Sequence, residues 1–341
     1  MTTAPNQFLR WVQLQLYTNN NTTPKNLVNS INLSQFRIRF NTVQCDRDSP
    51  NNTIIRIYNL APATVKQIKG AYQNVILNAG YQNGAHGTVF FGSIKQFREG
   101  RENATDTYLD LLCADGDLAF NQGFVSQSFP SGTSAATQYE TITSNMPGVS
   151  TGYTLNLSAD GIYRPIIRGK VVFGLGADAL GVIAASVGAS WSIQNGKVIM
   201  VRDADYIPGT AIQINTQTGL IGVPEQTDEG IKLRVLLNTN ARVRTLIQLD
   251  NTLINQIGSA DPNALAMLYY NKRGTNALMP VAPTNPDGIY CVMLAEHSGD
   301  TRGNEWYTDL LCLAVNKTAG PTPAIPSKGP VQGGNTNNVK K

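Results

Sequence analysis

The sequence predicts a mainly β protein with minor α content, built as two related tube-like antiparallel β-barrel domains that flank a small α+β middle domain. Three observations support this fold class. Short segments that alternate apolar and polar residues dominate both ends of the chain. A seven-residue motif around Asp110 recurs around Asp309. Between the two copies lies a different kind of sequence, in which a helix signal comes directly before a hairpin signal.

The chain begins with an N-terminal arm, residues 1–30, that contains an alternating run ending at Tyr17. Such a run can add as an edge strand to its own sheet or to the sheet of a neighbouring subunit. Trp11, Leu14 and Leu16 are therefore candidate interface residues.

The first barrel is predicted over residues 31–120. A helix is expected at 62–69, because Pro62 suits the first turn of a helix. The expected strands are 36–40, 53–58, 74–81, 88–97 and 106–113.

The middle domain is predicted over residues 121–217, with helices at 135–145 and 178–187. Asp178 is expected to cap the second helix and Gly188 to end it. An Asn195-Gly196 pair between two apolar segments then indicates a β-hairpin with a type I′ turn. The apolar stretch 171–191 is rich in Gly, Ala and Ser and runs into this hairpin, so stable membrane insertion is not expected.

The second barrel is predicted over residues 218–316, with strands at 231–237, 243–249, 289–294 and 306–315. The remaining segment, 317–341, is composed of Pro, Gly, Asn and Lys and is expected to be an extended tail. Its lysines are further candidate interface residues: Lys328, Lys340 and Lys341.

The repeated motif predicts that the two barrels are copies of one unit. Residues 107–113 and 306–312 agree at five of seven positions, at an offset of 199. The matched positions that we expect in a barrel core or interface strand are Tyr108, Asp110, Leu112 and Cys113 in the first copy and Tyr307, Asp309, Leu311 and Cys312 in the second. Weaker matches join 91–94 to 290–293 and 55–59 to 247–251. Chance agreement between two amphipathic strands is the alternative explanation.

Charge is scarce and balanced. Charged residues make up 15% of the chain, and the net charge of +4 comes from four lysines that follow Asp309. Sequence-specific nucleic-acid binding would need a clustered basic face, and only Arg37, Arg39 and Arg56 approach one. Low charge suits surfaces that become buried in an assembly, where each desolvated charge would be costly.

Candidate catalytic groups lack partners at recognisable spacing. Only two histidines occur, His86 and His297, and no two of the four cysteines have CxxC spacing. Ser150 lies in a GxSxG pattern without the strand-turn-helix context that this motif needs. Asp300, Glu305 and Asp309 could suggest glycan hydrolysis, but a position repeated in both copies more often serves the fold. We expect no catalytic, cofactor-binding or metal-binding residues.

Several segments, taken in order, resemble the baseplate hub proteins of contractile-tailed bacteriophages, as in Mu-like and related Pseudomonas and Burkholderia phages. They are NNTIIRIYNLAPATVKQI (51–68), VILNAGY with FFGSI (75–94), GDLAF (116–120), TGLIGVPEQTDEGIKLRVLLN (218–238) and HSGDTRGNEWYTDLLC (297–312).

The resemblance implies a structural homotrimer in the virion tail baseplate, assembled in the host cytoplasm. Its implied partners are the six-fold tail tube or a tube-initiator ring, the three-fold central spike, the tape-measure protein and neighbouring baseplate proteins. A trimer of two-barrel chains presents six similar modules, so it could act as a symmetry adapter. The alternative is a tail-associated lytic enzyme or a carbohydrate- or receptor-binding β protein.

Overall fold

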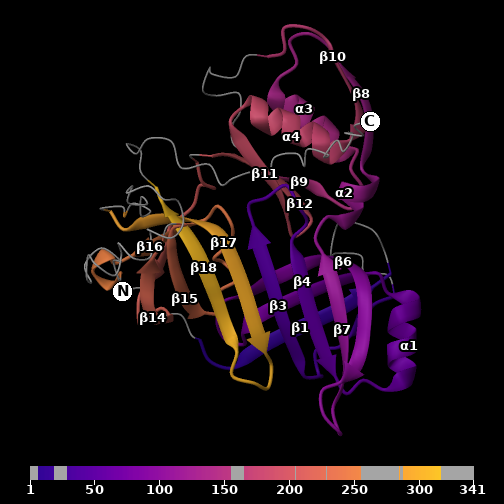
Figure 1. Cartoon of the computed structure of the whole chain (residues 1–341), viewed down its shortest axis with the longest axis vertical. Helices are drawn as coiled ribbons and strands as arrows, with labels where there is room; N and C mark the ends of the chain where they lie inside the picture. Colours follow the sequence, from indigo (N-terminus) through magenta and orange to yellow (C-terminus); the bar gives the residue numbers. More distant parts are fainter. Residues whose placement is uncertain are drawn as a thin grey trace, which may run out of the picture.

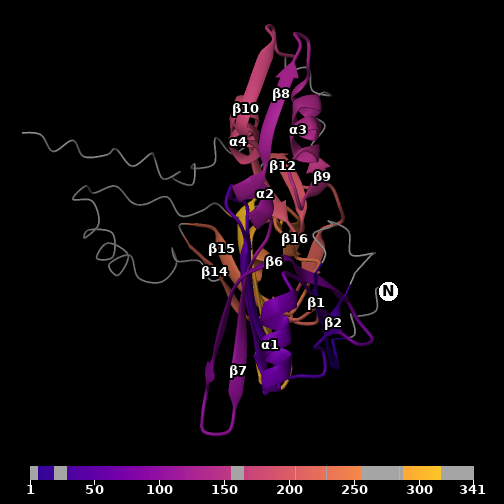
Figure 2. The same ribbon diagram turned by 90° about the vertical axis from the view of Figure 1, so that its right-hand side faces the viewer.

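A computed structural model describes residues 7–18, 29–154, 165–203, 205–227, 229–254, 284 and 287–315. Strands dominate it, and a large sheet carries a smaller domain of helices and short strands at one end (Figure 1). Seen from the side, the sheet is narrow, and the hairpin of β6 (His86–Arg101) and β7 (Thr107–Ala114) extends past helix α1 (Pro62–Ala71) (Figure 2). The mainly β fold with few helices is confirmed.

Within the described residues the large sheet has thirteen strands, and its main path runs β14-β15-β18-β17-β3-β4-β7-β6-β5-β1-β2; off this path, β16 pairs with β17 and β13 pairs with β16. The strands of the first half are β1 (Arg10–Tyr17), β2 (Ile31–Asn32), β3 (Ile38–Cys45), β4 (Asn52–Tyr58), β5 (Asn74–Tyr81), β6 (His86–Arg101) and β7 (Thr107–Ala114). Those of the second half are β13 (Ile212–Ile214), β14 (Leu220–Gln226), β15 (Ile231–Leu236), β16 (Leu246–Leu249), β17 (Ile289–Asp300) and β18 (Trp306–Ala314).

The two halves are joined through their backbones. Strand β3 pairs antiparallel with β17 over the register from Leu294 opposite Cys45 to Asp300 opposite Arg39. The predicted barrels are therefore found as two parts of one hydrogen-bonded sheet. Among the described strands, the pairing continues from one half into the other and does not close on itself within either half.

Each half packs its inward side chains into its own apolar core. Alternation along β3 and β4 buries Ile38, Phe40, Ile55 and Ile57 in the first core, with Ile68 of helix α1 (Pro62–Ala71). The second core is formed by buried residues that include Leu233 of β15, Tyr290 of β17 and Leu310 of β18. Trp306 of β18 reaches the first core, where its ring meets Phe40 edge-on at 5.7 Å between centroids.

The N-terminal strand belongs to the sheet of its own chain. β1 pairs along its whole length with β5, from Arg10 opposite Tyr81 to Tyr17 opposite Asn74. Of the two pairings that the sequence allows, the structure therefore has the one within the chain.

The middle domain builds a separate core from helices and two small sheets. Its elements are α2 (Asp117–Gln122), β8 (Phe124–Phe129), α3 (Ala135–Ser144), β9 (Ser150–Thr154), β10 (Lys170–Leu175), α4 (Gly176–Ser186), β11 (Ala189–Gln194) and β12 (Lys197–Arg202), and a 3-10 turn, η1 (Asn251–Leu253), lies in the second half of the chain. The predicted hairpin is β11–β12, and its turn residues Asn195 and Gly196 have φ angles of 53° and 73°, as a type I′ turn requires.

One local prediction needs correction. Helix α4 begins two residues earlier than expected, so Asp178 lies in its first turn and Leu175 is the N-cap. The apolar stretch that ends at Trp191 divides into β10, α4 and β11. No helix in the described part of the chain is both long and apolar enough to span a membrane.

Candidate functional site

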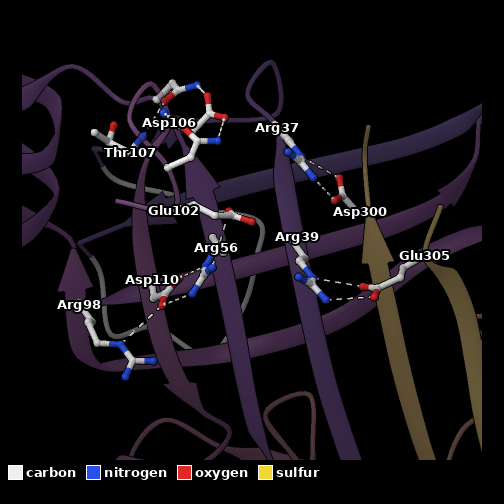
Figure 3. A network of polar contacts seen from close by, with 12 residues as sticks. Arg37, Arg39, Arg56, Arg98, Glu102, Asp106, Thr107, Asp110, Asp300 and Glu305 are labelled. Atoms are coloured by element: carbon white, nitrogen blue, oxygen red, sulfur yellow. Dashed lines mark hydrogen bonds and ion pairs between the residues drawn. The ribbon is translucent and has the colours of Figure 1, made fainter. Parts of the chain in front are cut away.

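The face of the sheet that points away from the two cores carries the densest set of interactions between charged side chains. Because side chains alternate along a strand, the residues between the core positions of β3, β4 and β7 share this face. They include Arg39, Arg56 and Asp110, and Figure 3 shows them with their partners. We call this surface the paired-charge face; its five arginines, each with a carboxylate partner, are Arg37, Arg39, Arg56, Arg98 and Arg234.

Arg56 and Asp110 form the best-enclosed pair of this face. They lie directly opposite each other on β4 and β7. Nε and Nη2 of Arg56 donate to the two oxygens of Asp110 at 2.7 and 3.0 Å. Asp110 is fully buried, and the Arg56 guanidinium lies 3.9 Å from the ring centroid of Tyr108. Arg98 of β6 contacts the same carboxylate at 3.6 Å.

The second half repeats this cluster. Arg234 lies opposite Asp309 on β15 and β18, and its Nε and Nη2 donate to the two carboxylate oxygens at 2.6 and 3.0 Å. The Arg234 guanidinium also lies 5.5 Å from the ring centroid of Tyr307. The repeated Tyr and Asp thus bind an arginine of the neighbouring strand in both halves, although the second pair is more exposed.

The same comparison corrects one of the weaker repeat matches. The strand equivalent to β4 is β15, because each pairs with the repeated strand through its arginine. Segment 247–251, which the sequence matched to 55–59, instead contains most of β16, which pairs with β13 and β17. Both hairpins, β6–β7 and β17–β18, carry a bulge at nearly the same place, opposite Leu112 and Leu311.

Two more arginine pairs lie where the halves meet. Arg37 donates to both oxygens of Asp300 at 3.2 and 2.7 Å, and Arg39 donates to both oxygens of Glu305 at 3.1 and 3.0 Å. Figure 3 shows these pairs bridging from Arg37, just before β3, and Arg39 of β3 to the end of β17 and the loop before β18. Sequence reasoning found Arg37, Arg39 and Arg56 but did not pair them with carboxylates, because the strand register is not visible in the sequence.

The pairing shifts the pKa values of its members. The hydrogen bonds that Arg37, Arg56 and Arg234 donate to Asp300, Asp110 and Asp309, respectively, raise the pKa of each arginine. Burial acts to raise the pKa of Asp300, but hydrogen bonds from Arg37 and from the Arg302 backbone outweigh it, so that pKa is lowered. The charged forms of Arg37, Arg56, Arg234 and Asp300 are therefore favoured by their partners.

A buried ion pair joins all three parts of the chain. Arg244, just before β16, has a 4% exposed side chain and donates through Nε to Asp46, just after β3, at 2.7 Å. Its Nη2 donates to Ser190 Oγ of β11 at 2.7 Å, and its Nη1 to the backbone oxygens of Asp203 and Asp205, both at 3.1 Å. We call this cluster the three-way joint.

A second contact fixes the hairpin of the middle domain. Asp115, which follows β7, is buried and accepts a hydrogen bond from the backbone N–H of Gly196 at 2.9 Å. Burial raises the pKa of Asp115 to about 7 against the opposing hydrogen bonds from the turn. A cavity of about 30 Å³ lies beside it, lined partly by Asn74 and Ser93.

The candidate catalytic residues are not brought together. His86 is exposed and its ring lies against Trp11 at 4.9 Å between centroids, whereas His297 is buried beside Thr308. Ser150 begins strand β9, and its backbone N–H donates to the Gly196 carbonyl. Within the described residues, no group of three or more His, Cys, Asp or Glu side chains could hold a metal ion.

The candidate interface residues have different surroundings. Leu14 and Leu16 lie in the first core of their own chain rather than on a surface, because the apolar face of β1 turns inward when it pairs with β5. Trp11 is half-buried. Lys328, Lys340 and Lys341 lie outside the described residues. In the repeated strands, Cys113 and Cys312 enter the two cores, whereas Leu112 and Leu311 are half-buried between core positions.

Sequence reasoning missed an exposed apolar surface on the ribbon of β8 and β10. Phe173 is 76% exposed, Val171 is 75% exposed, and Phe173 meets Phe124 edge-on at 4.8 Å between ring centroids. The β10 sequence, KVVFGL, has no apolar–polar alternation that would mark Val171 and Phe173 as outward-facing, and their exposure depends on the ribbon having only two strands. Exposed apolar patches often mark contact surfaces between proteins.

The fold is similar to that of two solved tail proteins. The 43 kDa tail protein of prophage MuSo2 from Shewanella oneidensis has a TM-score of 0.52 at 6% identity, over 90% of this chain and 98% of that one. A tail protein from Neisseria meningitidis MC58 has a TM-score of 0.51 at 9% identity, over 90% and 97% of the two chains. At these identities the likeness concerns the fold alone. No curated protein matches the sequence.

The family follows from the sequence itself. Residues 55–258, more than half of the chain, match the family described as Baseplate hub gp41. The matched region begins within β4 and includes the middle domain and β15 with its Arg234. The chain belongs to the Baseplate hub gp41 family, and it is a structural component of a phage tail baseplate.

Proposed function

We propose that three copies of this chain form a ring that joins the six-fold tail tube to the three-fold central spike. The observation that carries the proposal is the repeated cluster of Arg56, Asp110 and Tyr108 and of Arg234, Asp309 and Tyr307 in one sheet. A chain with two copies of one unit gives six similar units around a three-fold axis. Each of these units would be one half of the chain closed as a barrel: residues 31–120 in the first half and residues 218–316 in the second.

The same ring would serve as a conduit. Tape-measure protein and then DNA would pass through it during tail assembly and genome ejection, and neighbouring baseplate proteins would contact its outer surface. The exposed apolar ribbon of β8 and β10 supports such outer contacts. Assembly would take place in the host cytoplasm.

The proposal gives the chain no catalytic role. It is supported by the separation of the candidate groups, since His297 is enclosed beside Thr308 and Ser150 lies in a strand. Asp300 and Glu305 are each held by an arginine in a bidentate pair, which suits structural carboxylates better than a glycosidase acid and base.

Native mass spectrometry of the purified chain over a concentration series tests the ring. We expect a species of three times the 36.9 kDa chain mass. The chain should then be co-expressed with the spike protein of the same tail, and the trimer should bind one spike trimer. A chain that stays monomeric both alone and with its spike would contradict the proposal.

A further inference from the structure

The paired-charge face gathers five arginines on one surface: Arg37, Arg39, Arg56, Arg98 and Arg234. Arg39 and Arg56 lie directly opposite each other on β3 and β4. Like charges in directly opposed positions destabilise a sheet unless something neutralises them. Without partners, these side chains would make the clustered basic stripe that binds nucleic acid.

Each arginine of this face instead contacts a carboxylate of the same chain. Four of the five pairs use two parallel N–H···O bonds, and Arg98 shares the carboxylate of Asp110. The bidentate geometry matters because a guanidinium fork binds carboxylate and phosphate in the same way. A fork that already holds a carboxylate does not have that edge available for a phosphate.

The face nonetheless remains in contact with solvent. The side chains of Arg39, Arg98 and Arg234 are 47%, 61% and 53% exposed. Two more carboxylates lie among the pairs, since Glu102 is 3.8 Å from Arg56 and Glu296 lies opposite Asp309. The surface is thus hydrophilic and close to neutral, although it is built from many charges.

We infer that the paired-charge face is the surface past which double-stranded DNA moves, and that its carboxylates occupy the arginine forks so that DNA phosphates cannot. This inference rests on the proposed function of the ring as a conduit. Unpaired arginines would hold the DNA backbone through release of counterions, and carboxylates alone would repel it. With its arginines and carboxylates paired, the face neither holds the DNA backbone nor repels it.

The test frees two arginines without disturbing the core. The double variant Glu305→Gln and Asp309→Asn leaves Arg39 and Arg234 without their carboxylates, at pairs that are partly exposed to solvent. Binding of the full-length protein to a fluorescein-labelled duplex of about 20 base pairs is followed by anisotropy between about 50 and 200 mM salt, the range in which phosphate contacts change affinity most visibly. The control is Asp205→Asn, which removes the carboxylate of an arginine pair in the middle domain.

We expect no saturable binding by the wild-type protein or by the control. The double variant should bind, and the slope of log affinity against log salt should reach about −2 per chain, since each neutralised phosphate contributes about −0.9. Adding Arg39→Gln and Arg234→Gln to the double variant should abolish the gain. A folded double variant that gains no binding overturns the inference, and so does an equal gain by the control.

Phage particles that carry the double variant give the second readout. Complete particles that release DNA more slowly than wild type support the inference. Failure of these variants to assemble overturns it, because the face would then be a contact between proteins. If the double variant is misfolded by circular dichroism, Glu305→Gln alone is tested in the same way. A wild-type chain that is not trimeric would count against the proposed function. The DNA binding measured by anisotropy does not depend on trimerisation, because it tests only the arginine–carboxylate pairs.

Discussion

His297 lies on β17 with its side chain almost fully enclosed, at 1% exposure, and its Nδ1 is 2.9 Å from Oγ1 of Thr308. Opposite it on β3 lies Thr42, so the ring sits on the core side of the sheet where the two halves meet. Burial, with a smaller effect of nearby Arg242, lowers the pKa of His297 to about 4. The residue is therefore neutral in the folded protein at physiological pH.

We predict that His297 makes the fold sensitive to acid. Between pH 6.5, its ordinary pKa, and about 4, the unfolded chain binds a proton that the folded chain does not. Stability from this residue is thus lost as the pH falls through that window, by up to about 3 kcal/mol. Urea unfolding of wild type and His297→Gln at pH 7 and pH 4.5 checks this.

The difference in the free energy of unfolding between wild type and His297→Gln should be smaller at pH 4.5 than at pH 7, because only the wild type loses stability through protonation of His297. Asp115 acts in the opposite direction. Its raised pKa of about 7 means that its contribution is present below its ordinary value of 3.8 and is lost as the pH rises through 7. The comparison of variants is therefore more informative than the wild-type curve alone. A difference that is the same at both pH values would contradict the prediction.

At the scale of elements, the strand pairs β4–β7 and β15–β18 carry the same ion pair in different surroundings. Asp110 is fully buried and receives two arginines, whereas the side chain of Asp309 is 33% exposed. A buried pair depends strongly on both partners being present, while an exposed pair contributes little. The Arg56–Asp110 and Arg234–Asp309 pairs should therefore contribute different amounts to the free energy of unfolding, although the same residue types form both.

We expect Asp110→Asn to lower the free energy of unfolding by about 2–3 kcal/mol, because the charges of Arg56 and Arg98 lose their partner in a partly desolvated site. Asp309→Asn, the matched change in the second half, should cost less than about 1 kcal/mol. Urea midpoints measure both. Combining Asp110→Asn with Arg56→Gln should cost less than the sum of the single changes. Equal costs for the two aspartates would show that burial does not set the difference.

Most elements could be predicted from local patterns. The alternation of β4, Pro62 at the start of α1 and the Asn195-Gly196 turn each act over a few residues, so a single sequence reveals them. The cap of α4 was predicted wrongly because an acidic residue also suits the first turn of a helix. The partners of Arg39 and Arg56 could not be predicted, because strand register depends on contacts far apart in the chain.

At the scale of the whole molecule, the three-way joint helps to fix the middle domain on the sheet, together with the contact between Asp115 and Gly196. Arg244 alone binds Asp46, Ser190 and three backbone carbonyls, and these partners belong to different parts of the chain. Nothing in the local sequence marks it, since its partners lie between 39 and 198 positions away. The pairing of β3 with β17 is equally remote, so the sequence suggested two separate units where the structure has one sheet.

Replacing Arg244 with Met should lower the free energy of unfolding by about 3–5 kcal/mol, since Asp46 would remain buried and uncompensated. Hydrogen exchange should also become faster in β11 and β12, which the joint holds against the sheet. Arg39→Met is the matched control, because it removes an arginine from a pair that is about half exposed, and should cost less than about 1 kcal/mol. If both changes had the same effect on stability and exchange, the joint would not have the role assigned to it.

The pairing of β3 with β17 also has a consequence for synthesis on the ribosome. One edge of β3 pairs with the nearby strand β4, but residues 39–45 on the other edge pair with residues 294–300, which are translated about 250 residues later. At about 5–20 residues per second, this interval is about 12–50 s. Throughout it, the nascent chain carries an unpaired strand edge, which is a template for aggregation. Arg39 and Asn41, both exposed, put polar groups beside that edge, so the side chains that later meet carboxylates of the second half would first keep the unfinished protein apart from its neighbours.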